Sequence, residues 1–250
     1  MPRRLLVTTM VLAAHATAFA AETPTARDKA LPCRPTVSCT ADLAAPGTLE
    51  VEAGWLTAKG DFGSTKNAPM LVKLTLTKLV QLQVGSNGPT FVEPSRALYF
   101  DDVLVGAKLH LTDQSKTGPS FAVTALVGIP TYNGLEAFVT GHASKDLGPI
   151  HADVNLGISE YQLDTTPVSQ GFGAIALSTS LPPPFGVALE TYYFTDAAPI
   201  PHDGGVRLAL SATPKPWLVF DFGGDVGFFP SVRSFSLFFG MSIVPVVLWR

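Results

Sequence analysis

An alternation of apolar and polar side chains, with a period of two residues, runs through most of this 250-residue chain and constrains its fold more than any other feature. In residues 150–158, the clearest instance, His151, Asp153 and Asn155 lie between apolar side chains. This is the pattern of a β-strand with one apolar and one polar face. About twelve such segments follow one another: 49–55, 72–76, 80–84, 103–111, 121–129, 137–144, 150–158, 172–181, 185–193, 206–212, 218–228 and 235–249.

The segments are long enough to cross a bilayer when tilted, and the links between them alternate in length as in outer-membrane barrels. The short links, expected on the periplasmic side, are 77–78, 112–118, 145–148, 182–184 and 214–216. The longer outer loops are 58–68, 87–97, 130–134, 162–170, 196–204 and 230–233. The sequence therefore predicts an all-β fold, an antiparallel transmembrane β-barrel of about 12 strands over residues 47–250. A soluble β-sandwich, whose buried faces also alternate, is the alternative.

The composition agrees with strands joined by many turns. The chain contains 22 Gly and 21 Pro, a load that helix interiors tolerate poorly but that bends and loops accept. Hydrophobic residues make up 46% of the chain and charged residues only 15%, which excludes disorder as its main state. With 17 Lys and Arg against 20 Asp and Glu and no basic stripe, no nucleic-acid partner is expected.

The first 20 residues have the layout of a secretory signal peptide. Arg3 and Arg4 precede the apolar run 5–14, and Ala18-Phe19-Ala20 offers a small-x-small cleavage site. A transmembrane helix would need about 20 apolar residues, and this run is about half that long. We therefore expect an exported protein, in which residues 21–46, rich in Ala, Pro and Thr, form an irregular periplasmic arm.

Cys33 and Cys39 are the two cysteines of the chain, and both lie in this arm. An exported segment is exposed to oxidising conditions, so a local disulfide between them is expected. Its short loop predicts a modest contribution to stability, confined to an arm that is independent of the barrel. Two cysteines without a nearby pair of histidines make a poor zinc site, and no metal is expected.

The polar rows of the strands would face the barrel interior. They supply the candidate residues of a solute path: Lys73, Gln81, Lys108, His110, Asp153, Glu190, Arg207, Asp221 and Asp225. A barrel of about twelve strands is intermediate between filled small barrels and open porins, so a narrow or partly plugged passage is expected. The charged side chains would form either a selectivity ring or an ion-paired filling. For Glu190, a basic partner such as Arg207 is expected on the next strand.

A lipid hydrolase is an alternative, because His142 and Ser144 share a strand face and His151 and Asp153 follow on the next strand. The arrangement departs from that of outer-membrane phospholipase A, in which a His-x-Ser-Asn motif is paired with a further Asn. Here Lys145 follows the serine. The sequence carries no nucleophile elbow, zinc-binding helix motif, phosphate loop or dinucleotide fingerprint. We expect no enzyme activity and no cofactor.

Several short motifs resemble one family of barrels over residues 47–244. They are Asp102-Val103-Leu104-Val105-Gly106-Ala107-Lys108, Leu126-Val127-Gly128-Ile129-Pro130-Thr131, an isolated Glu190, and Gly205-Val206-Arg207-Leu208 leading through Pro216 to Leu218-Val219-Phe220-Asp221 and Gly227. With these motifs the chain resembles the outer-membrane barrels described as transporters of the MetA pathway of phenol degradation. The strand-ending Pro-Thr-Gly of that family is here Pro130-Thr131-Tyr132-Asn133-Gly134, which implies a loop of different length.

The resemblance implies a transporter or channel in the outer membrane of a Gram-negative bacterium, whose cargo would be small molecules, aromatic ones among them. Its partners would be outer-membrane lipid, the barrel-assembly machinery and a small-molecule solute. A closed structural barrel without transport is the alternative function.

Overall fold

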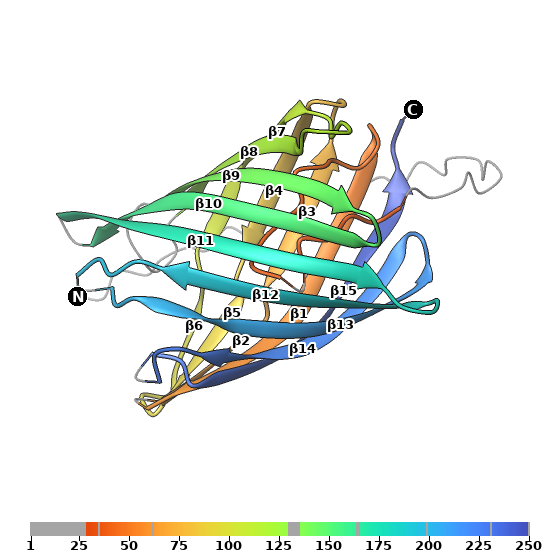
Figure 1. The fold of residues 1–250 in the computed structure, drawn as a ribbon. Coiled ribbons are helices and arrows are strands. Elements are labelled where there is room, and N and C mark those ends of the chain that lie inside the picture. The colour runs from red at the N-terminus through yellow and green to blue at the C-terminus, as the bar shows by residue number, and fades with distance from the viewer. Residues whose placement is uncertain are drawn as a thin grey trace, which may run out of the picture.

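The structure, a computed structural model, describes residues 29–34, 36–61, 63–129, 136–163, 166–198, 200–230 and 232–249. The expected signal peptide, Met1–Ala20, lies outside these residues. Within the described part of the chain every regular element is a β-strand (Figure 1). The same residues include no helix that is long and apolar enough to cross a membrane.

Fifteen strand segments form one antiparallel sheet. They are β1 (Thr48–Gly60), β2 (Gly63–Asn67), β3 (Met70–Thr75), β4 (Val80–Ser86), β5 (Pro89–Glu93), β6 (Ala97–Phe100), β7 (Val103–Thr112), β8 (Ser120–Ile129), β9 (Glu136–Leu147), β10 (Ile150–Leu163), β11 (Thr166–Ser180), β12 (Phe185–Phe194), β13 (Asp203–Lys215), β14 (Leu218–Gly227) and β15 (Phe235–Val247).

The sheet closes on itself, because β15 pairs with β14 on one side and with β1 on the other. β3 and β2 are hydrogen-bonded to successive parts of β1, so they are two segments of one strand. In the same way β4 and β5 are successive segments of the next strand, and β7 and β6 of the one after it. Each pair is therefore one interrupted strand, and the molecule is a closed antiparallel barrel of 12 strands. The predicted fold class is confirmed.

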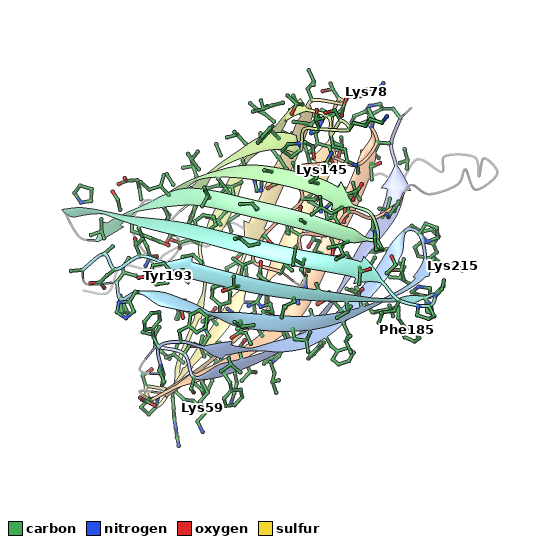
Figure 2. All side chains as sticks on the ribbon, viewed as in Figure 1. Lys59, Lys78, Lys145, Phe185, Tyr193 and Lys215 are labelled. Carbon is green, nitrogen blue, oxygen red and sulfur yellow. A yellow bond between two sulfur atoms is a disulfide. The ribbon has the colours of Figure 1, made fainter. Side chains whose placement is uncertain are left out.

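The two faces of the wall have opposite chemistry. Figure 2 shows the side chains of the described residues on the ribbon, with many carbon-rich side chains projecting outward from the barrel. Leu156 and Phe239 point outward with 66% and 61% of their surfaces exposed. Asn155, next to Leu156 in the chain, points inward and is 1% exposed. A soluble sandwich buries its apolar face, whereas here the apolar face is outside and charged side chains are buried, so the sandwich alternative does not hold.

Three of the predicted outer loops are largely strand. Residues 58–68 contain the end of β1 and all of β2, residues 87–97 contain β5, and residues 162–170 contain the end of β10 and the start of β11. Their side chains are too polar for an apolar alternation, but the backbone keeps its ladder pairing there, with Lys59 opposite Ser64 and Lys66 opposite Phe91. The predicted loop 130–134 lies outside the described residues.

The barrel has two distinct ends. We call the end with the links from β3 to β4, β7 to β8, β9 to β10, β11 to β12 and β13 to β14 the turn end, and the opposite end the loop end. β1 begins and β15 ends at the turn end, where Leu248 N donates to Gly47 O at 2.8 Å. The segment that precedes β1 therefore starts its course at this end.

Candidate functional site

Residues 29–34 and 36–46, which we call the arm, lie inside the barrel. Figure 1 shows them as a red to orange trace behind the strands. From Gly47 the arm passes along the inner wall and comes back to the turn end, where Ala30 N donates to Pro216 O at 2.9 Å. The expectation of an arm independent of the barrel is therefore wrong for these residues. Residues 21–28 lie outside the described part of the chain.

Glu190 on β12 holds the middle of the arm. Its two carboxylate oxygens accept hydrogen bonds from Val37 N, Ser38 N and Ser38 Oγ, each at 2.7 Å. The side chain is 1% exposed. An irregular backbone has no strand partner for its N–H groups, and a buried carboxylate supplies strong acceptors for them. Glu190 therefore acts as an anchor for the arm.

The expected pairing of Glu190 with Arg207 takes a different form. The two residues do lie directly opposite each other on β12 and β13. The guanidinium of Arg207, however, pairs with Asp225 on β14, with Nη2 to Oδ2 at 2.8 Å. The oxygens of Glu190 accept hydrogen bonds from the arm, and the alternation of residues along the strands does not predict these contacts.

A second anchor lies on β1 and β3. Lys73 Nζ is 2.6 Å from Glu52 Oε1 and 3.2 Å from Glu50 Oε2, and it donates to Leu31 O at 2.7 Å. Glu52 accepts from Cys33 N at 3.0 Å and from Arg34 N at 3.1 Å. These three wall side chains are nearly inaccessible to solvent. A buried ion pair is tolerated here because the arm supplies hydrogen bonds to Glu52, to Lys73 and to Glu50 Oε2, whereas Glu50 Oε1 has no hydrogen-bond partner among the described residues.

A third set of contacts comes from β7, β9 and β10. Asn155 pairs with the backbone of Cys39 in both directions, accepting from its N at 2.7 Å and donating to its O at 2.9 Å. Ser144 Oγ accepts from Ala41 N at 2.6 Å. Lys108 Nζ donates to the carbonyl of Thr40, and His110 Nδ1 donates to the carbonyl of Ala41 at 3.1 Å. The wall thus takes the place of strand neighbours for the arm.

Arg34 lies in a notch made by two glycines that face each other across the β1–β15 pair. A Cβ on Gly54 would be 2.5 Å from Arg34 Cζ, and a Cβ on Gly240 would be 2.5 Å from Arg34 Nε. The Arg34 Nη2 group also donates to Asp221 Oδ1 and to Phe239 O, at 3.3 and 3.2 Å. The arginine therefore spans the seam where the last strand meets the first.

The disulfide between Cys33 and Cys39 is present in the structure. It closes the turn that carries Arg34 and Ser38 to their wall partners. The bridge thus belongs to the lumen and holds the part of the arm with the most contacts.

A separate polar cluster occupies the loop-end half of the lumen. Arg233 Nη2 is 2.7 Å from Asp203 Oδ2, and Arg233 Nη1 donates to the hydroxyl of Tyr192 at 3.1 Å. The guanidinium groups of Arg207 and Arg233 lie 5.5 and 5.7 Å from the ring centre of Tyr192. These charges are paired with carboxylates and supported by an aromatic face.

The remaining candidates also face inward. Gln81 Nε2 donates to Thr75 Oγ1 and Gln81 Oε1 accepts from Gln83, both at 3.0 Å. Asp153 is bonded to His151 Nε2 at 3.2 Å. Five of the nine candidates therefore reach the arm directly: Lys73, Lys108, His110, Glu190 and Asp221. The sequence analysis did not identify Arg34, Gly54 and Gly240. The available signal was that Gly54 on β1 and Gly240 on β15 both occupy positions that face inward.

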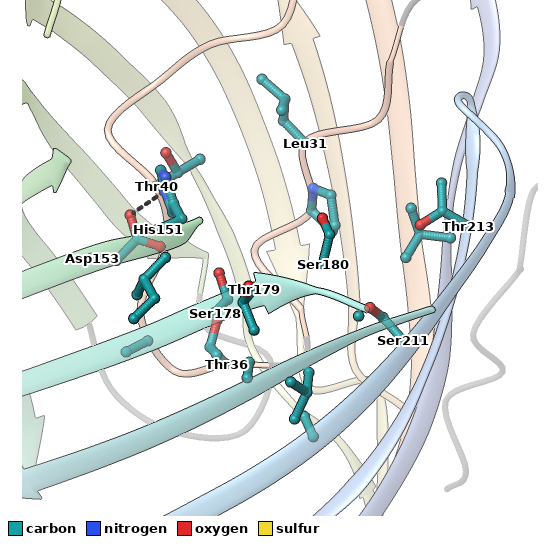
Figure 3. A pocket seen from close by; sticks show the side chains of 18 of the residues that line it. Leu31, Thr36, Thr40, His151, Asp153, Ser178, Thr179, Ser180, Ser211 and Thr213 are labelled. Atoms are coloured by element: carbon teal, nitrogen blue, oxygen red, sulfur yellow. Dashed lines mark hydrogen bonds and ion pairs between the residues drawn. The ribbon is translucent and has the colours of Figure 1, made fainter. Parts of the chain in front are cut away.

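A cavity of about 530 Å³ remains between the arm and the wall strands β10 to β13, near the turn end. Thr36 and Thr40 of the arm line it, and Figure 3 shows Thr40 beside His151 and Thr36 near Ser178. Ser178, Ser211 and the interacting pair His151 and Asp153 come from the wall. We call this cavity the vestibule.

The serine and histidines of the hydrolase alternative do not form a nucleophile and base pair in this geometry. Ser144 Oγ lies within hydrogen-bond distance of Asp153. The two ring nitrogens of His142 lie 2.8 Å from Thr124 Oγ1 and 3.0 Å from Asn155 Oδ1. A Ser–His pair requires the imidazole to be the hydrogen-bond partner of the serine, and both His142 and His151 are hydrogen-bonded to other side chains.

A closed 12-stranded antiparallel barrel with an apolar outer face and a polar lumen has the architecture of outer-membrane β-barrel proteins. No family model matches the chain, and no curated protein matches it either. Among solved structures, the chain is similar in fold to the NanC porin, with a TM-score of 0.57 at 11% identity over 78% of this chain and 98% of the other. It is also similar to an outer membrane channel from Pseudomonas putida F1, with a TM-score of 0.59 at 10% identity over 81% and 97%.

Proposed function

We propose that this protein is a channel or transporter of the outer membrane of a Gram-negative bacterium, which passes small molecules through a lumen narrowed by its own arm. The observation that carries the proposal is the vestibule, a cavity of about 530 Å³ beside the arm inside a closed, polar-walled barrel. Such a volume lies within the range of small-molecule sites, about 300–1,000 Å³. Both named solved structures of similar fold are, by their descriptions, a porin and a channel.

The cargo class follows from the resemblance to the barrels of the MetA pathway of phenol degradation, which favours small, aromatic solutes. The vestibule has room for such molecules and combines apolar with hydroxyl-bearing side chains. Outer-membrane lipid would surround the apolar rows of the wall, and the barrel-assembly machinery would insert the chain after signal-peptide removal.

A closed barrel without transport is the second candidate function. The observation that favours it is the density of contacts between arm and wall, in which Glu52, Glu190 and Asn155 each bind the arm more than once. A filled lumen would serve stability alone.

Liposome swelling separates the two. Purified protein in liposomes is challenged with a panel of small aromatics and sugars of graded size. The transport proposal expects swelling rates that fall steeply with solute size, with the small aromatic solutes entering. Swelling at the rate of protein-free liposomes for every solute would favour the closed barrel.

A further inference from the structure

The wall opposite the arm changes character between β11 and β13. Elsewhere long side chains such as Glu52, Lys73 and Lys108 reach the arm, but at the vestibule the inward residues are small. The strand register places them next to one another, with Ser178 opposite Ala188 and Ala188 opposite Ala209. The vestibule therefore exists because this sector of the wall has no side chain long enough to fill the space.

Hydroxyl groups line this sector. Ser178 and Ser180 on β11 and Ser211 and Thr213 on β13 border the vestibule (Figure 3). In contrast to the arm hydroxyls, which bind the arm or the wall, these four have no hydrogen-bond partner among the described residues. Each hydroxyl can donate one hydrogen bond and accept others. The four hydroxyls are therefore complementary to ligand groups that can also both donate and accept hydrogen bonds.

Four of the charged or titratable groups at the vestibule are paired: Arg34 is paired with Asp221 at 3.3 Å, and His151 is hydrogen-bonded to Asp146 at 2.7 Å and to Asp153 at 3.2 Å. Lys29 and Asp42 also border the vestibule and add one charge of each sign, so together they contribute no net charge. An anion would meet these carboxylates, and a charged ligand of either sign would lose hydration on entry. Neutral ligands avoid both penalties.

We propose that the vestibule is a binding site for a small, neutral, polyhydroxylated molecule. Its hydroxyl groups bind Ser178 and Ser211 from two directions, and its carbon skeleton lies against the small apolar residues Ala188 and Ala209. The inference rests on the proposed function for the passage of small solutes, but it assigns the vestibule to a polyhydroxylated solute in place of the aromatic class that the resemblance favours, so binding and permeation are measured separately.

Binding is tested with sorbitol, a neutral hexitol, against gluconate, which has the same carbon number and a carboxylate. Saturation-transfer NMR on the detergent-solubilised full chain is expected to show transfer to sorbitol and little to gluconate. Removal of two hydroxyls in Ser178→Ala/Ser211→Ala is expected to weaken sorbitol binding about tenfold, since each hydrogen bond contributes roughly 0.5–1.5 kcal/mol. The matched control Ser169→Ala, on β11 at the loop end, is expected to bind as the unmodified chain does.

A second variant, Ala188→Leu, fills the vestibule and is expected to abolish sorbitol binding while the arm contacts of Glu190 remain. Heat-modifiable migration on gels verifies that each variant is folded. Absent transfer to sorbitol, equal transfer to gluconate, or unchanged binding in the double serine variant would each overturn the site. Benzyl alcohol that binds more tightly than sorbitol, and independently of the serines, would overturn it in favour of an apolar ligand.

Liposome swelling distinguishes this inference from the proposed function. Sorbitol binding without swelling in any solute retains the site and contradicts transport. Swelling without sorbitol binding retains transport and contradicts the site.

Discussion

Single residues decide how the arm is held, and the glycine notch is the tightest of these contacts. Gly54 leaves room for Arg34, but a Cβ there would also lie 2.6 Å from the backbone oxygen of Phe239. Real Cβ atoms do not approach a carbonyl oxygen so closely. The glycine therefore serves two purposes, space for an arginine of the arm and close approach of the first and last strands.

This double role predicts that Gly54→Ala destabilises the barrel by about 1–3 kcal/mol, the usual cost of forcing extra atoms into a packed site. The thermal midpoint of heat-modifiable gel migration reports the change. Removal of the arginine in Gly54→Ala/Arg34→Ala should not restore stability, because the contact with the backbone of Phe239 remains. Full recovery in the double variant would show that the arginine alone requires the glycine.

Glu190 gives a second test at this scale. In Glu190→Gln the amide retains one acceptor oxygen, and its NH₂ group faces an N–H donor of the arm. We expect a looser arm, a stability loss of about 1–3 kcal/mol from the unsatisfied buried group, and a larger single-channel conductance. The matched control is Glu160→Gln on β10, whose exposed carboxylate accepts a hydrogen bond from Ser169 and not from the arm. Equal single-channel currents in the two variants would contradict the role of Glu190 as an anchor of the arm.

At the scale of elements, the strands test the assigned facing of the wall. Leu208 on β13 points outward and Ser211 on the same strand borders the vestibule. An outward arginine near mid-bilayer costs on the order of 2–4 kcal/mol, so Leu208→Arg should assemble poorly. Ser211→Arg, which points into a polar space, should reach the membrane in normal amount. Urea titration of the folded gel band measures both, and equal midpoints would contradict the facing of β13.

The disulfide is the second element-scale test. Since it closes a short loop, its entropic contribution is modest, but it fixes the turn that presents N–H groups to Glu52 and Glu190. In Cys33→Ser/Cys39→Ser we expect an intact barrel with a more mobile arm, seen as faster protease cleavage within residues 29–46. Collapse of the barrel would make the disulfide a folding requirement, and an unchanged cleavage rate would make it dispensable.

The strands could be predicted from the sequence and the arm could not, for one physical reason. The direction in which a strand residue faces is a local property. The period of two alone predicts that Leu156 faces outward and Asn155 inward. The arm has no period, and its bonds join backbone N–H groups to carboxylates far away in the chain, as Val37 does with Glu190, 153 residues later. The inward position of Glu190 was visible, but the backbone segment that it binds was not. The extensions β2 and β5 were missed because ladder pairing, not side-chain pattern, defines them.

At the scale of the whole molecule, the arm turns an otherwise hollow barrel into a narrow one, and the backbone pairing that closes the barrel does not involve the arm. β1 and β15 pair along most of their lengths through their own backbones. A variant that lacks residues 29–45 should therefore still form a heat-modifiable barrel. Its carboxylates at Glu52 and Glu190 lose the donors of the arm, and water must hydrate them instead.

That variant should conduct several-fold more current and prefer cations more strongly than the intact chain. Deletion of the arm removes a steric obstruction from the lumen. It also removes two basic residues, Lys29 and Arg34, and only one acidic residue, Asp42, so the carboxylates of the lumen wall are less neutralised. Single-channel recordings give the conductance, and the reversal potential in a salt gradient gives the selectivity. Arg34→Ala, which removes one positive charge but keeps the arm, should shift the reversal potential in the same direction with a smaller rise in conductance. A deletion variant with the conductance and reversal potential of the intact chain would mean that the narrowest part of the passage lies in the loop-end cluster around Arg207 and Arg233, and not at the arm.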